Sequence, residues 1–120
     1  MSKLINIFPG VTLLSQTDER VVLALTISDT LDYFKGHFDQ APILAGVVQL
    51  DWAVKYAHQF LGFPQWVNDI EVLKFQMVIT PNVTVNLLLE RNNNGKCIFK
   101  YSSDKGQHAS GRLVYAQESP

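Results

Sequence analysis

The sequence predicts a single α+β domain in which an antiparallel sheet curves around one long helix. Residues 46–61 are apolar on nearly every side of a helix, so this helix should be buried. The chain after it, residues 67–116, alternates between apolar and polar side chains in runs that turns separate, which is typical of antiparallel strands. A sheet that accompanies only one buried helix must curve around that helix to cover it.

Extended structure is predicted before the helix. Residues 11–14 and 21–27 are rich in Val, Leu and Thr, and the polar residues 16–19 separate them, so we expect a hairpin. Residues 28–39 follow neither a helical nor a strand period and combine aromatic side chains with a glycine and a histidine. This composition predicts a structured loop.

Turn residues divide the second half of the chain. Gly62 is placed to end the helix, and Pro64 prevents it from restarting. Asn and Gly tolerate a positive φ at low cost, so the chain should turn where they gather. The predicted strands are residues 67–79, 83–90, 96–101 and 108–116, with turns at 81–82, 92–95 and 104–106.

Length, charge and cysteine content limit the possible classes of protein. A chain of 120 residues fits one domain, residues 1–120. The net charge of −1 provides no basic field for nucleic acid or for an anionic membrane surface. Cys97 lies in an alternating apolar run and should be buried, and one cysteine allows no disulfide within the chain. Neither a signal peptide nor a spanning helix fits the N-terminus, so we expect a cytoplasmic protein.

Residues 33–51 carry the most informative pattern. An aromatic-x-Gly-His-Phe loop at residues 34–38 precedes Pro42 and Gly46, and the acidic Asp51 follows five positions after this glycine. The segment resembles the active-site signature of the FabA/FabZ family of bacterial 3-hydroxyacyl-carrier-protein dehydratases. The resemblance implies a hotdog fold and the dehydration of (3R)-3-hydroxyacyl thioesters on acyl carrier protein to trans-2-enoyl thioesters, without a cofactor.

The same residues offer one group for each chemical task of this elimination. It needs a base for the C2 proton, an acid for the departing hydroxyl, and a donor to the enolate-like oxygen. His37 has an imidazole that can be neutral at working pH, so it can act as the base. Gly46 lies in the first turn of the helix, where free N–H groups and the positive end of the dipole favour an anionic oxygen. Asp51 lies among apolar helix residues, where desolvation favours the protonated acid.

Three positions depart from the pattern of the family. Asp39 and Ala45 stand where the family has prolines, and Lys55 stands where it usually has a glutamine bonded to the acid. Lys55 is also four residues after Asp51, so a helix ion pair that keeps the carboxylate charged is an alternative. These changes favour a specialised branch, and residues 47–53 are similar to the FabZ-like dehydratases of aryl polyene gene clusters.

The resemblance also implies partners and substrate contacts. In hotdog dehydratases the histidine and the acid face each other across a dimer, so His37 of one subunit should act with Asp51 of the other. A homodimer is expected, and a heterodimer with a related chain is possible. The resemblance further implies that Phe38, Pro42 and Val47 lie against the substrate.

A carrier protein is acidic, so a local basic rim should bind it, and Lys35 and Lys74 are the candidates. His58 and His108 are interpreted as incidental histidines. Because no second histidine or cysteine stands at ligand spacing, no metal site is expected. Two other functions stay open: a hotdog thioesterase, which would not need the Gly-His-Phe loop, and a catalytically impaired partner subunit.

Overall fold

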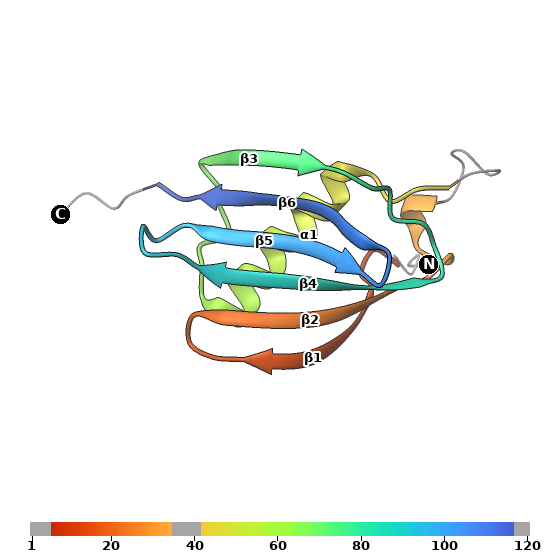
Figure 1. Ribbon diagram of the computed structural model, residues 1–120, viewed down its shortest axis with the longest axis horizontal. Helices are drawn as coiled ribbons and strands as arrows, with labels where there is room; N and C mark the ends of the chain where they lie inside the picture. The colour runs from red at the N-terminus through yellow and green to blue at the C-terminus, as the bar shows by residue number, and fades with distance from the viewer. Residues whose placement is uncertain (1–5, 35–41, 117–120) are drawn as a thin grey trace, which may run out of the picture.

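The computed structural model describes residues 6–34 and 42–116. In these residues one helix covers one face of a six-stranded antiparallel sheet (Figure 1). This arrangement confirms the predicted α+β layout, and the helix has the predicted bounds. The elements are β1 (Gly10–Gln16), β2 (Arg20–Ile27), a 3-10 turn (Asp32–Phe34), α1 (Gly46–Leu61), β3 (Asp69–Phe75), β4 (Val83–Arg91), β5 (Cys97–Ser103) and β6 (Gly106–Val114).

The order of the strands differs from the order along the chain. The sheet runs β1-β2-β4-β5-β6-β3, so β3 pairs with β6 and not with β4 (Figure 1). β4 is already paired with β2 on one side and β5 on the other, which leaves β3 only the free edge of β6. The predicted strand 67–79 is therefore shorter, because residues 76–82 have to cross the end of the β5–β6 hairpin to reach β4.

A bulge in β3 decides which way the end of this edge strand faces. The register with β6 shifts between Glu71 and Lys74, and Val72 has a φ of 47°, which is rare for a β-branched residue. After the shift Phe75 pairs with Ala109, whose side chain is buried in the core. Since side chains alternate across a sheet, Phe75 lies on the same face as Ala109, toward the helix.

The helix is buried on one face only. Trp52, Ala53 and Ala57 are inaccessible and pack into the core with the inward side chains of β2, β4 and β5. Asp51 and Lys55 are exposed, so in this single chain the burial predicted for a helix that is apolar on nearly every side is limited to one face. The buried side chains of α1 lie in the core with the sheet, whereas Asp51, Lys55, His58 and Gln59 are exposed.

The ends of elements agree with the turn residues. Gly62 has a φ of 72°, and its N–H donates to the carbonyl of His58, which ends α1 as predicted. Gly95 and Gly106 also have positive φ values in the predicted turns. Cys97 is buried as expected, and burial raises the pKa of its thiol to about 12.

Two buried tyrosine hydroxyls make a matched pair for a stability measurement. The Tyr101 hydroxyl donates to the backbone carbonyl of Gln49 at 2.6 Å, whereas the buried hydroxyl of Tyr115 has no partner among the described residues. We expect Tyr101→Phe to lower the free energy of unfolding by about 1 kcal/mol, because one buried hydrogen bond is lost. Tyr115→Phe should leave it unchanged or raise it. Urea unfolding followed by circular dichroism measures both, and equal losses would contradict the assignment.

Candidate active site

The amino-terminal end of α1 presents free backbone donors. Ala45 precedes the helix in an extended conformation and makes no side-chain cap. The N–H groups of Val48 and Gln49 donate back to the Ala45 carbonyl, at 3.1 and 3.2 Å. None of the described residues accepts a hydrogen bond from the N–H of Gly46 or Val47. Two donors and the positive end of the helix dipole are therefore available to an anionic oxygen.

The segment that leads into the helix is held from both sides. The Leu44 N–H donates to the Ile79 carbonyl at 2.7 Å, and Gln49 Nε2 donates to the Leu44 carbonyl at 3.1 Å. Pro42, which is half-buried, belongs to the same segment. Residues 42–45 are thus fixed between the 76–82 crossover and the helix, and this contact positions the first turn of α1.

Gly46 is in close contact with an aromatic ring. A Cβ built at this position would lie 2.6 Å from Cζ of Phe75, well inside any normal contact distance. Without a side chain, Gly46 therefore allows the ring of Phe75 to reach the helix. The sequence pattern explained this glycine only by the approach of an acyl carbonyl, which stays a prediction.

Asp51 lies near the start of the helix face that the sheet does not cover. Its side chain is exposed, so the predicted desolvation by its own helix is wrong for the single chain. Asp51 borders a pocket of about 480 Å³, whose other lining residues are Phe8, Val54, Lys55, His58, Gln59 and Gln65.

The predicted alternative for Lys55 is not observed. Its ammonium lies 4.5 Å from the centre of the Phe8 ring, in a cation–π contact. Among the described residues Asp51 forms no ion pair with Lys55 or any other cation. The interpretation of Lys55 as the ion-pair partner of Asp51 is therefore wrong for this structure.

Tyr33, which precedes the histidine loop, lies near Asp51. Burial raises the pKa of the Tyr33 phenol, and the nearby negative charges of Asp51 and Asp32 raise it further. The beginning of the loop therefore lies within the electrostatic reach of Asp51. His37, Phe38 and Lys35 lie outside the described residues, so their roles stay predictions.

A family model described as ApeI-like, ApeI dehydratase, matches residues 14–112. The chain belongs to the ApeI-like dehydratase family. This match confirms the resemblance to hotdog dehydratases and shows that the chain is a dehydratase by family. No curated protein sequence matches the chain significantly.

Solved structures agree with this family. The chain is 29% identical to a chain of the dehydratase heterocomplex ApeI:P from Xenorhabdus doucetiae, covering 91% of this chain and 98% of that one, with a TM-score of 0.81. It is 31% identical to an uncharacterized protein from Erwinia carotovora subsp. atroseptica, covering 89% and 94%, with a TM-score of 0.75. The E. coli PaaI protein, at 16% identity, 86% and 79% coverage and a TM-score of 0.63, shares the fold. The hotdog fold is confirmed.

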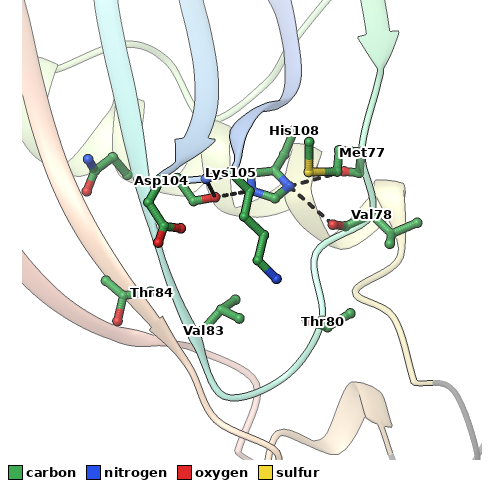
Figure 2. A pocket seen from close by; sticks show the side chains of 10 residues that line it. Met77, Val78, Thr80, Val83, Thr84, Asp104, Lys105 and His108 are labelled. Atoms are coloured by element: carbon green, nitrogen blue, oxygen red, sulfur yellow. Dashed lines mark hydrogen bonds between the residues drawn. The ribbon is translucent and has the colours of Figure 1, made fainter.

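A second pocket of this ApeI-like chain, of about 540 Å³, lies between the crossover and the β5–β6 turn (Figure 2). His108 borders this pocket and is only 4% exposed. Its Nε2 lies 2.7 Å from Ser103 Oγ, and its Nδ1 lies 3.2 Å from the Val78 carbonyl. Because a carbonyl only accepts, the proton lies on Nδ1, and Nε2 accepts from the serine hydroxyl. His108 thus ties the β5–β6 hairpin to the crossover.

Sequence reasoning missed three residues near Asp51 in this ApeI-like site. Phe8 and His58 border the same pocket as Asp51, and the charge of Asp51 affects the pKa of Tyr33. For His58 a signal was present, because positions 51, 55 and 58 share one helical face. The candidate Lys74 is exposed on β3 opposite Ser110, away from the helix.

Two further findings concern metals and membranes. Within residues 6–34 and 42–116 of this ApeI-like chain, no three His, Cys, Asp or Glu side chains are grouped so that they could hold a metal ion. In the same residues no helix combines the length and apolar character needed to cross a membrane.

Proposed function

We propose that this chain removes water from (3R)-3-hydroxyacyl thioesters on acyl carrier protein and gives trans-2-enoyl thioesters. The observation that carries the proposal is the pair of unpartnered N–H groups at Gly46 and Val47, with the carboxylic acid of Asp51 one to two turns further along the same helix. Membership of the ApeI-like dehydratase family supports the reaction type.

In this mechanism three groups move or hold charge. His37 takes the C2 proton, and the electron pair forms an enolate-like thioester whose oxygen accepts hydrogen bonds from the N–H groups of Gly46 and Val47. Asp51 then gives its proton to the C3 hydroxyl, which leaves as water while the C2–C3 double bond forms. Phe38, Pro42 and Val47 would contact the acyl group.

The active unit in this proposal holds two subunits. Asp51 is exposed in the single chain, and the edge strand β3 presents the exposed apolar side chains of Val72 and Leu73. A second subunit would cover this surface and supply His37 to the site of its neighbour. A homodimer or a complex with a related chain would both do so, and the similar ApeI:P structure is a heterocomplex. We place the reaction in fatty acid or aryl polyene type biosynthesis in the cytoplasm.

The test is incubation with an enoyl thioester and, separately, with its 3-hydroxy counterpart. Absorbance near 260 nm follows the conjugated enoyl thioester, and a thiol reagent follows hydrolysis in the same sample. We expect the two thioesters to interconvert without release of thiol. Release of thiol would indicate the thioesterase instead.

Because the similar ApeI:P structure is a heterocomplex, the assay also tests whether this chain needs a related partner chain. If neither reaction occurs with the purified chain, the same assay is repeated after mixing with a related hotdog chain from the same genome. Activity that appears only in the mixture would identify this chain as one subunit of a heterodimer. No reaction in either sample would overturn the proposal.

Activity on a carrier-bound substrate should depend on the basic rim more than activity on a small substrate does. Charge reversal at Lys35 and Lys74 is expected to lower kcat/KM for the carrier-bound substrate about tenfold, because steering of an acidic partner depends on local charge. The effect on an N-acetylcysteamine thioester should be small. Reversal of Arg20 on β2 and Lys105 in the β5–β6 turn, both of which are exposed, is the matched control. Equal losses on both substrates would exclude Lys35 and Lys74 as the carrier contact.

A further inference from the structure

The direction of Phe75 is set by the bulge in β3. Without the register shift between Glu71 and Lys74, Phe75 would pair with His108, whose side chain lies on the outer face of the sheet. The shift requires Val72 to adopt a φ of 47°, a conformation that costs a β-branched residue free energy. Bulges commonly re-aim a side chain next to an active site. Here the bulge turns Phe75 toward the helix.

The ring of Phe75 contacts the helix at Gly46, and the rest of the ring is exposed. Three ring carbons lie within 3.0 Å of a Cβ built on Gly46, so the tip of the ring points at this residue. The side chain nevertheless remains 50% exposed. An apolar ring surface is therefore presented beside the first turn of α1, where Gly46 and Val47 have free N–H groups.

The acyl group has to pass this ring in the proposed reaction. Its carbonyl oxygen binds at Gly46 and Val47, and its C3 hydroxyl reaches Asp51. Asp51 is five positions after Gly46 in the helix, which is about 7.5 Å along the axis. The C1–C2–C3 chain therefore starts beside Gly46 and runs along the exposed face of α1. C1 and C2 lie at the end nearest to Phe75.

We propose that Phe75 is a specificity-determining residue whose ring contacts C2 of the acyl group and excludes a substituent at this carbon. The inference rests on the proposed dehydration. It assigns to the enzyme a preference for 3-hydroxyacyl thioesters that are unbranched at C2. It also gives the strained bulge at Val72 a role, because only the shifted register brings the ring to the site.

The experiment compares an unbranched 3-hydroxyacyl N-acetylcysteamine thioester with its 2-methyl analogue. Replacement of Phe75 with alanine should raise the ratio of kcat/KM for the branched over the unbranched substrate about tenfold, the usual effect of one methyl group in an apolar pocket. Phe75→Leu should give an intermediate ratio. Leu13→Ala, at a side chain that is 49% exposed on the opposite edge strand β1, should leave the ratio unchanged.

A second pair of variants tests the contact itself. Gly46→Ala should lower the stability and the turnover, since its methyl group meets the Phe75 ring. In the Phe75→Ala background the same change should cost much less. This rescue is measured by urea unfolding and by turnover on the unbranched substrate. Equal losses in the two backgrounds would show that the ring does not limit the space at Gly46.

The outcomes separate this inference from the proposed function. If wild-type protein does not interconvert the unbranched substrate, either alone or mixed with a related hotdog chain from the same genome, the dehydration proposal fails. If it does, but Phe75→Ala lowers kcat/KM for both substrates by the same factor, the ring only supports the fold or the subunit contact, and the inference is overturned. Light scattering on each variant shows whether the subunits still associate.

Discussion

Replacement of His37 with alanine is expected to lower the turnover of 3-hydroxyacyl thioesters by at least about 10²-fold, because a general base contributes a factor of this order. The fold should remain intact, since a loop histidine that acts as base contributes to the transition state more than to packing. Initial rates of interconversion and the urea unfolding midpoint measure the two effects. A variant that kept more than about a tenth of the wild-type rate would rule out His37 as the base.

His58 is the informative comparison for this variant. It borders the same pocket as Asp51. Its Nδ1 lies 2.7 Å from the Phe63 carbonyl, so this hydrogen bond engages Nδ1 and not Nε2. If His58→Ala lost turnover while His37→Ala kept it, the base would come from the helix and not from the loop. Under the proposed mechanism the His58 variant loses less than the His37 variant.

The sequence predicted the elements of the fold because each has a local signal. The helix begins at Gly46 and ends before Gly62 as expected, since the apolar period stops where a glycine can take a positive φ. The strands of the β4–β5–β6 meander follow from alternation and from turn residues. The position of β3 did not follow, because alternation reports which face a side chain takes but not which strand lies beside it.

The candidate site was only partly predictable for a related reason. The apolar residues on nearly every side of α1 predicted a buried helix, yet its own sheet covers one face. A sequence does not distinguish a surface that the same chain covers from one that a second subunit covers, so the exposure of Asp51 was missed. The contact between Gly46 and Phe75 depends on the bulge at Val72, and a valine carries no local signal for a positive φ.

Two inactive variants should restore activity when they are mixed. If His37 and Asp51 act across the subunit interface, a dimer of His37→Ala with Asp51→Ala has one site with both lesions and one site with neither. Equal amounts that exchange subunits at random give about half heterodimers, so activity should approach about a quarter of the wild-type value. Turnover is measured before and after exchange by mild denaturation and refolding, and each variant treated alone is the control.

The result also decides between arrangements of the site. If both residues came from the same subunit, every site in the mixture would carry one lesion and no activity would return. The exposure of Asp51 in the single chain favours the shared site, because an acid that needs cover gains it from the same partner that brings the base. A mixture that mass spectrometry shows to have exchanged, but that stays inactive, would exclude the cross-subunit arrangement. The dehydratase family of the chain would be unaffected, because it rests on the match over residues 14–112.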